Sequence, residues 1–321
     1  MDAFTVQWSS KHELAEGCQL YHYTTLGGMR GILEERSYWY GHASSLNDSN
    51  EIQYGRRVIS DVLNDVMKRQ SREDVREFQR QLLLQVQAFG EGMFHIFLVC
   101  FCKSENLLSQ WREYADRGGG YCLGFEFSSA TRFTSSLEKL AEGKIPYLRK
   151  VIYEEEDQRG LVTSYVDAVT TAAKNSLDSR SASHCSDQSI YSLPVMATMM
   201  AMQAVNLLLD MLLCLKHPAF KEEREWRLLR VTNEDHEPEN IHFRESAAGL
   251  VPYRPTHVYD MEERGQAVFP LRSISFGPML DSVRTNAAIA LLLHHIAADL
   301  HPIALPSPYK IKIRDPGYNL R

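Results

Sequence analysis

Residues 94–102 read FHIFLVCFC, a continuous apolar run that polar residues follow directly. A run of this length and composition predicts a strand that is covered on both faces, near the centre of a sheet. Residues 107–115 then place Leu, Trp, Tyr and Ala at helical spacing, which predicts a short helix. Three glycines at 118–120 end that helix. The apolar run therefore predicts the centre of a fold that combines strands and helices.

Shorter strand signals lie on both sides of this central run, in segments rich in aromatic and β-branched residues. The predicted strands are residues 20–24, 38–40, 121–127, 150–153, 225–231, 273–276 and 309–313. Helical patterns separate them at residues 29–33, 55–89 and 282–300. This mixture predicts an α+β fold with a mixed or antiparallel central sheet.

Residues 154–216 have no strand signal and predict a helical insertion within a single α+β domain of residues 1–321. Part of this interval, residues 195–215, is apolar and about long enough to span a bilayer. Gln203, Asn206 and Asp210 interrupt it on one helical stripe, so we expect a buried helix and no membrane contact. The insertion is also the expected place for a protein partner.

The composition is that of a soluble globular chain. It has 35 Lys and Arg against 41 Asp and Glu, a net charge of −6, which argues against sequence-independent wrapping of nucleic acid. The six cysteines form no CxxC pair, so neither a zinc site nor disulfides are expected, and no other metal site is assigned. The first residues lack the pattern of a signal peptide, and the expected location is cytoplasmic.

His22 is the first candidate site residue. In a strand of residues 20–24, His22 and Thr24 share one face, and an imidazole and a hydroxyl on one face can both reach a ribose or a phosphate. The competing interpretation is a buried histidine that is bonded to a backbone carbonyl.

Glu225 is the second candidate, in the run KEEREWRL of residues 221–228. In a strand, Glu223, Glu225 and Arg227 share a face, and the cation would keep a neighbouring carboxylate ionised by lowering its pKa. Such a carboxylate can accept hydrogen bonds from sugar hydroxyls and stabilise developing positive charge. The competing interpretation is an exposed, charged strand end.

Four blocks of sequence resemble, in order, the bacterial domain-of-unknown-function family numbered 2971. The first is LYHYTTLGGMRGILEERSYWYGHASSLNDSNE at 20–51, where that family has an LYHYT strand and an LNDP.E motif. The others are SENLLSQWREYADRGGGYCLGF at 104–125, FKEEREWRLL at 220–229 and SISFGPML at 273–280. Ser49 replaces the usual Pro, and Gln110 replaces the usual Met. The resemblance spans most of the chain, with the helical insertion as its variable part.

The order of these motifs is also similar, more weakly, to ADP-ribosyltransferases of the His-Tyr-Glu type. That similarity implies an ADP-ribosyltransferase-like fold and NAD as substrate. His22 and Thr24 would hold the ribose, Tyr40 or Tyr38 would stack on nicotinamide, and Glu225 would act as the catalytic acid. The remaining residues that would contact NAD are Tyr21, Arg30, Asn47, Asp48 and Arg227. The acceptor would be protein, nucleic acid or water, and the role that of a toxin or an anti-phage defence effector.

Two other functions compete with this NAD-consuming enzyme. One is a metal-dependent nuclease with carboxylate ligands from distant segments, namely Asp48, Glu51, Glu223 and Glu225, and with Lys221 at the phosphate. The other is a non-catalytic sensor or adaptor of a defence system, whose helical insertion binds a partner.

Overall fold

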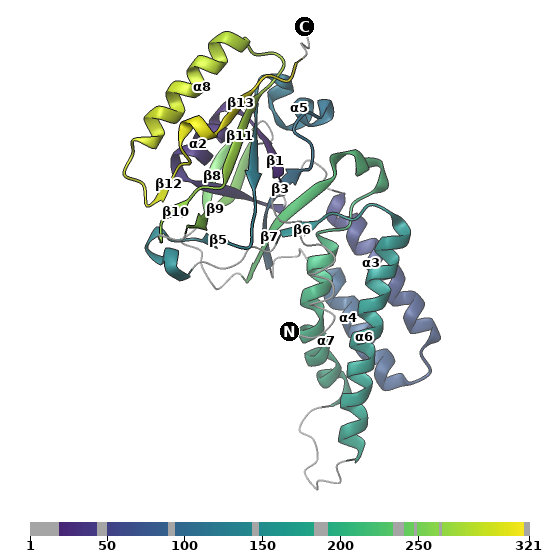
Figure 1. Cartoon of the computed structure of the whole chain (residues 1–321). Coiled ribbons are helices and arrows are strands. Elements are labelled where there is room, and N and C mark those ends of the chain that lie inside the picture. Colours follow the sequence, from purple (N-terminus) through teal and green to yellow (C-terminus); the bar gives the residue numbers. More distant parts are fainter. Residues whose placement is uncertain are drawn as a thin grey trace.

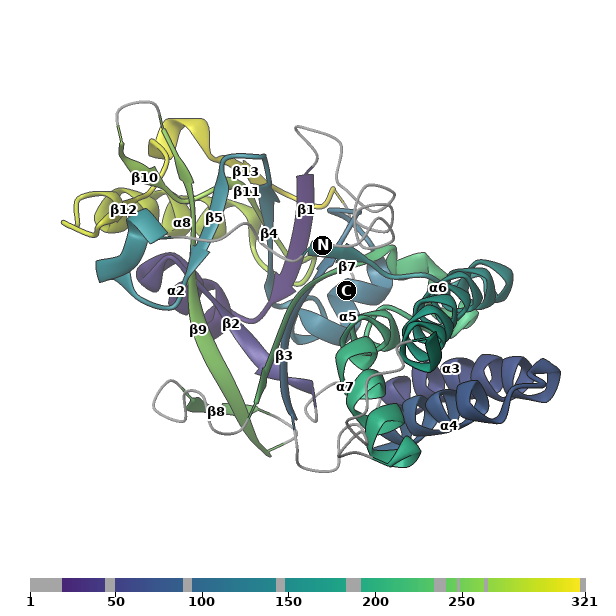
Figure 2. The same cartoon turned by 90° about the horizontal axis from the view of Figure 1, so that it is seen from below.

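The structure is a computed structural model that joins a curled sheet to a bundle of helices (Figure 1). It describes residues 19–43, 50–88, 94–142, 148–182, 192–233, 241–246, 249–262 and 265–317. Seen from below, the strands fan out on one side and the bundle lies on the other (Figure 2). The two parts meet at the central strands and the ends of the bundle helices.

The described strands form one 13-stranded mixed sheet, which confirms the predicted combination of a mixed sheet with helices. They are β1 (Gln19–Thr24), β2 (Ser37–His42), β3 (Phe94–Cys102), β4 (Tyr121–Glu126), β5 (Thr131–Thr134), β6 (Leu148–Lys150), β7 (Glu225–Asn233), β8 (His242–Ser246), β9 (Gly249–Met261), β10 (Ala267–Val268), β11 (Leu271–Phe276), β12 (Ile303–Ala304) and β13 (Lys312–Arg314). The main path runs β12-β10-β9-β2-β3-β1-β4-β11-β13, while β7 pairs with β3. The β10–β12 and β11–β13 pairs are parallel, and the others are antiparallel.

The predicted central strand, β3, is where the sheet divides. One edge of β3 pairs with β7 from Phe94 to Cys102. The other edge pairs with β1 at Cys102 and with β2 at Leu98 and Phe97. We call the open interval between these pairings, around Cys100, the fork. Its backbone groups need partners from side chains or solvent.

Helices cover the two sides of the sheet differently. One side packs against α2 (Leu26–Glu35) and α8 (Ser282–Ala297), which bury Met29, Ile32 and Ile289 in a core with Phe97 and Phe101 of β3. Thr25 caps the start of α2 by accepting a hydrogen bond from the Gly28 N–H. The short helix α5 (Leu108–Tyr114) follows β3 as predicted and buries Trp111.

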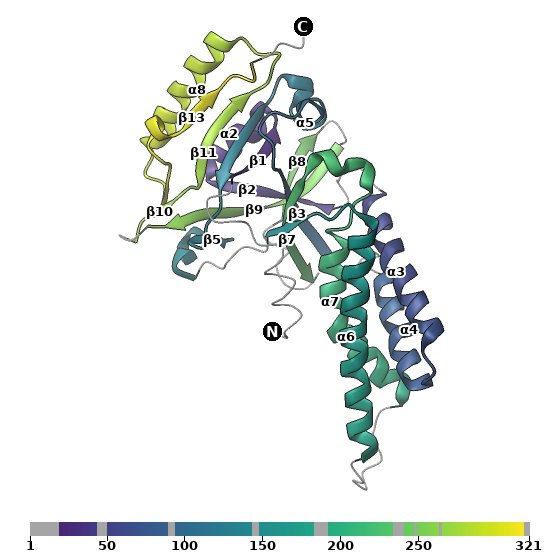
Figure 3. The same ribbon diagram turned by 45° about the vertical axis from the view of Figure 1, so that its right-hand side comes forward.

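The bundle packs against the other side of β3 and β7 (Figure 3). It consists of α3 (Glu51–Arg69), α4 (Glu73–Ala88), α6 (Glu155–Ala182) and α7 (Leu193–Leu212). The described residues of 154–216 thus contain two helices and no strand, apart from a single bridge from Leu215 to Ile152. Two of the four bundle helices, α3 and α4, come from the predicted helical region at 55–89, so the bundle is built from two separate segments.

Among the described helices, α7 is the one with the length and composition that would allow it to cross a membrane. It lies against α4, and one face is buried there. The buried residues are Ala197, Ala201, Val205, Leu208, Leu209, Met211 and Leu212. Asp210 lies among them, and burial raises its pKa to about 6.

Strand β9 is the longest strand that the sequence pattern did not predict. It contains Pro252 and Pro255. Proline has no N–H to donate to a neighbouring strand, so two prolines in one segment normally argue against a strand. Its pairing with β8 ends at Tyr253 and its pairing with β5 begins at His257. Pro255 falls in the interval between those two partners, where that edge of β9 pairs with none of the described strands.

Gly55 permits the close approach of α3 to α7. A Cβ atom at Gly55 would lie 2.5 Å from the Leu212 carbonyl oxygen, whereas one at Gly160 on α6 would meet nothing within 4 Å. We therefore expect Gly55→Ala to lower the free energy of unfolding by about 1–3 kcal/mol, because backbone must move. Gly160→Ala should raise it by up to about 1 kcal/mol through helix propensity. Urea unfolding of both variants checks this, and equal effects would contradict it.

Candidate functional site

His22 spans the fork. Its Nδ1 donates to the Cys100 carbonyl at 2.9 Å, which leaves Nε2 as the acceptor of the neutral ring. The ring is half-buried, with its centroid 5.7 Å from that of Phe101 and 6.5 Å from that of Tyr38. Burial and, to a lesser degree, the charge of Arg244 lower the pKa of His22. The structure therefore shows the carbonyl-bonded histidine of the competing interpretation, with one ring nitrogen still able to accept a hydrogen bond.

Tyr38 and Tyr40 lie in the apolar core beside the fork, and both are buried. The Tyr38 ring meets Phe125 and Phe101 edge-on, with centroids 4.9 and 5.3 Å away. Stacking on nicotinamide needs an open ring face, so as placed neither tyrosine can do what the resemblance implies. Thr256 lies opposite Tyr38 on β9, and among the described residues neither hydroxyl has a hydrogen-bond partner.

The other residues predicted around His22 are dispersed. Thr24 is half-buried under α2, where a Cβ atom at Gly28 would collide with its hydroxyl. The Tyr21 hydroxyl donates to Gln19 at 3.1 Å, and Tyr21 packs on the opposite side of β1, beside Tyr23. Arg30 is exposed and pairs with Glu34 at 2.8 Å. Asn47 and Asp48 lie outside the described residues.

Glu225 and Arg227 belong to a buried group of charges where the bundle meets the sheet. We call it the junction cluster, and its members are Glu51, Lys216, Glu223, Glu225 and Arg227. Lys216 Nζ lies 2.6 Å from Glu223, 2.9 Å from Glu225 and 3.5 Å from Glu51. Arg227 donates to both oxygens of Glu225, at 2.8 and 2.9 Å, and also to Glu51. The cluster thus links α3 and the chain after α7 to β7.

Mutual attraction favours the charged forms of Glu225 and Arg227 despite their burial. Burial alone would raise the pKa of Glu225, but Arg227 and Lys216 together hold it at about 2. Burial would likewise lower the pKa of Arg227, and Glu225 and Glu51 keep it above its ordinary value. Glu223 is the most accessible member, and burial raises its pKa. Three acidic and two basic side chains therefore share one largely buried site.

Strand register separates Glu225 from His22. Tyr21 pairs with Cys102, and Cys102 pairs with Glu225, so these three side chains lie on one side of the sheet. His22 is the next residue along β1 after Tyr21, so its side chain lies on the other side of the sheet, beside Phe101. The structure therefore does not bring Glu225 and Arg227 to the predicted NAD site, because side chains alternate along each strand.

The carboxylates of the predicted nuclease do converge in part. Glu51, Glu223 and Glu225 come together, but they surround Lys216 instead of leaving room for a metal ion. Lys221 pairs with Glu154 at the surface. Within the described ranges no three Asp, Glu, His or Cys side chains are arranged to hold a metal ion. Lys216 was missed because it follows an apolar run, away from the charged segment.

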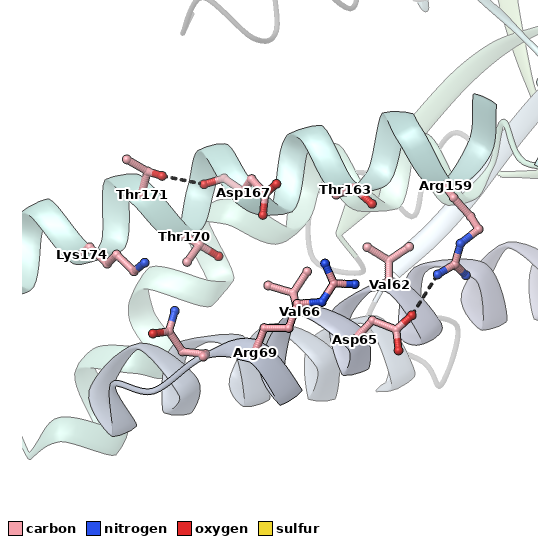
Figure 4. Close-up of a pocket in the computed structure, with 11 residues that line it drawn as sticks. Val62, Asp65, Val66, Arg69, Arg159, Thr163, Asp167, Thr170, Thr171 and Lys174 are labelled. Carbon is pink, nitrogen blue, oxygen red and sulfur yellow. Dashed lines mark hydrogen bonds and ion pairs between the residues drawn. The ribbon is translucent and has the colours of Figure 1, made fainter. Parts of the chain in front are cut away.

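A polar groove in the bundle was also missed by the sequence patterns. It lies between α3 and α6 and encloses about 280 Å³ (Figure 4). Its floor is formed by Val62 and Val66 of α3, and charged and hydroxyl side chains of both helices line it.

Comparison with known proteins gives one match. A family model described as protein of unknown function (DUF2971) matches residues 110–228, which supports the resemblance to that family over this range. The range begins in α5 and ends in β7. It includes four members of the junction cluster but neither Glu51 nor the fork residue His22. No curated protein and no solved structure matches the chain.

Proposed function

We propose that this chain is a non-catalytic sensor or adaptor. In this proposal the bundle receives a ligand or partner, and the sheet is the scaffold to which the junction cluster fixes the bundle. The observation that carries the proposal is that both oxygens of Glu225 are engaged by Arg227, and one of them also by Lys216. A carboxylate held in this way supports the contact between two parts of the fold.

The position of Glu225 also argues against its use in cleaving NAD. Stabilising an oxocarbenium-like state requires a carboxylate aimed at the reacting carbon, with its charge available there. The charge of Glu225 is already balanced by two cations, and the sheet lies between Glu225 and His22. Freeing it for the reaction would leave Arg227 buried without its main partner.

The proposal is tested by incubating the full chain with NAD and candidate acceptors and measuring nicotinamide release. An active ADP-ribosyltransferase in the same assay serves as the positive control. We expect no release above the rate without protein, and no metal-dependent cutting of nucleic acid in a parallel incubation. Release that His22→Ala abolishes would overturn the sensor proposal in favour of an enzyme.

An ADP-ribosyltransferase-like, NAD-consuming enzyme is the second candidate, and the fork is what favours it. There, the acceptor Nε2 of His22 lies on one side of the sheet with the hydroxyls of Tyr38 and Thr256, which have no hydrogen-bond partner among the described residues, and the charge of Arg244 acts on His22. These groups suit a ribose and a pyrophosphate.

Calorimetric titration with NAD tests this candidate. His22→Ala should weaken NAD binding about 10-fold, because the substitution removes one hydrogen bond of the neutral imidazole and the packing of the ring. Arg76→Gln removes an exposed cation from α4 in the bundle; it is the control and should bind NAD as the parent does.

A further inference from the structure

Helix α8 presents an apolar surface to solvent. Its inner side is buried against the sheet through Ile289, Leu293 and Ile296, and its outer side faces away from the rest of the molecule (Figure 1). The four most exposed large apolar side chains among the described residues lie on α8 or on the chain that follows it, namely Val283, Leu291, Leu300 and Tyr309. An exposed apolar surface that gathers in one place marks an interaction site.

The outer side of α8 forms one continuous stripe. Ala287 and Ala288 are exposed one turn before Leu291, and His294 is exposed one turn after it. The ring of His294 meets that of Tyr309 edge-on, with centroids 5.4 Å apart. Residues three and four positions apart share a helix face, so these side chains lie together with Leu291 at their centre. We call these five residues the α8 stripe.

Two charges flank the α8 stripe at its ends. Arg284 lies in the first turn of α8, Asp299 lies just after its last residue, and both are exposed. Within the described part of the chain, neither side chain makes an ion pair. Each charge also lies at the unfavourable end of the helix dipole, the cation near the amino terminus and the carboxylate near the carboxyl terminus. A partner that supplies the opposite charge at each end would stabilise both.

We propose that α8 pairs with α8 of a second copy of this chain, antiparallel and about a two-fold axis beside Leu291. Arg284 lies seven residues before Leu291 and Asp299 lies eight residues after it. In this arrangement Arg284 of each copy therefore lies beside Asp299 of the other, and each charge is also favourable to the dipole of the partner helix. The small side chain of Ala287 leaves room for His294 of the second copy. A surface that complements itself in this way forms a closed dimer.

The size of the contact sets the expected affinity. Helix α8 has 16 residues and is about 24 Å long. One pair of helices of this length buries an area at the low end of specific interfaces, below about 1,200 Å², which is typical of weak association. We therefore expect a dissociation constant of about 10 µM. Figures 1 and 2 show α8 and the bundle at opposite ends of the molecule, so the pairing does not depend on what the bundle receives.

Sedimentation velocity of the full chain at about 1–200 µM tests the pairing. The apparent mass should rise with concentration from the 36.8 kDa of one chain toward twice that value. Leu291→Asp should weaken association about 100-fold, because two carboxylates would meet at the centre of the contact. Leu84→Asp is the matched control. Leu84 is 48% exposed on α4 in the bundle, so this variant should associate as the parent does.

An exchange of charges tests the antiparallel arrangement. Arg284→Glu and Asp299→Arg should each weaken association about 10-fold, because each places like charges together at both ends of the contact. The double variant should associate as the parent does, since the ion pairs form again with their signs exchanged. Circular dichroism checks the fold of each variant, which should persist because both side chains are exposed.

Three results would overturn the proposal. One is a single chain throughout the concentration range; flotation of that monomer with phosphatidylserine vesicles, lost in Leu291→Asp, would then show that α8 contacts a membrane. The second is association that Leu291→Asp leaves unchanged, which would place the contact elsewhere. The third is a double variant that associates no more tightly than either single charge variant, which would exclude the antiparallel arrangement.

Discussion

Replacing Arg227 by methionine should lower the free energy of unfolding by about 3–5 kcal/mol, the largest loss expected of a single substitution in this chain. Arg227 is buried and donates to Glu225, to Glu51 and to the Leu213 carbonyl. Methionine has a similar length but no charge, so the substitution leaves two buried carboxylates with Lys216 as their remaining cation. Urea or guanidinium unfolding, followed by circular dichroism, measures the loss.

Lys221→Met is the matched control. Lys221 lies in the same segment and also pairs with a glutamate, Glu154, but both side chains are more than half exposed. Exposed pairs contribute at most about 1 kcal/mol, so this variant should be close to the parent. Equal stability of the Arg227 and Lys221 variants would show that the junction cluster does not hold the fold together.

Glu225→Gln should lower the free energy of unfolding at pH 7 by about 2–4 kcal/mol, and this loss should depend on pH. The pKa of Glu225 is held at about 2, against 4.5 for an unperturbed glutamate. Its charge therefore contributes stability that is fully present above about pH 4.5 and is lost as the pH falls through 2. The difference between the parent and the variant should shrink over that window.

Measuring unfolding of both proteins at a series of pH values from 7 to about 2.5 checks the direction. A difference that stays constant as the pH falls would mean that the carboxylate charge is not what stabilises the junction. A variant as stable as the parent at pH 7, but unable to release nicotinamide that the parent releases, would give Glu225 the catalytic role implied by the resemblance.

The central strand was predictable because its signal is local. Residues 94–102 are apolar throughout, and β3 occupies those residues. Strand β9 was not predictable, because Pro255 is compatible with it only in the interval where one edge of the strand changes its partner from β8 to β5. That arrangement depends on β5 and β8, which lie more than 100 residues apart in the sequence.

The candidate site was predictable only in its single residues. His22, Glu225 and Arg227 were singled out from local spacing, and each does make specific polar contacts. Whether they share a side of the sheet depends on the register of β1, β3 and β7, which no local pattern contains. The ion pairs that Glu51 makes with Lys216 and Arg227 likewise arise from tertiary packing between the bundle and the sheet.

A double-mutant cycle between Glu51 on α3 and Arg227 on β7 tests most directly whether the junction cluster joins the bundle to the sheet. The free energies of unfolding of the parent, Glu51→Gln, Arg227→Met and the double variant are measured under one condition. Because the two side chains share a hydrogen bond, the losses should not add, with a coupling of about 1–3 kcal/mol. Losses that add to within about 0.5 kcal/mol would contradict the account.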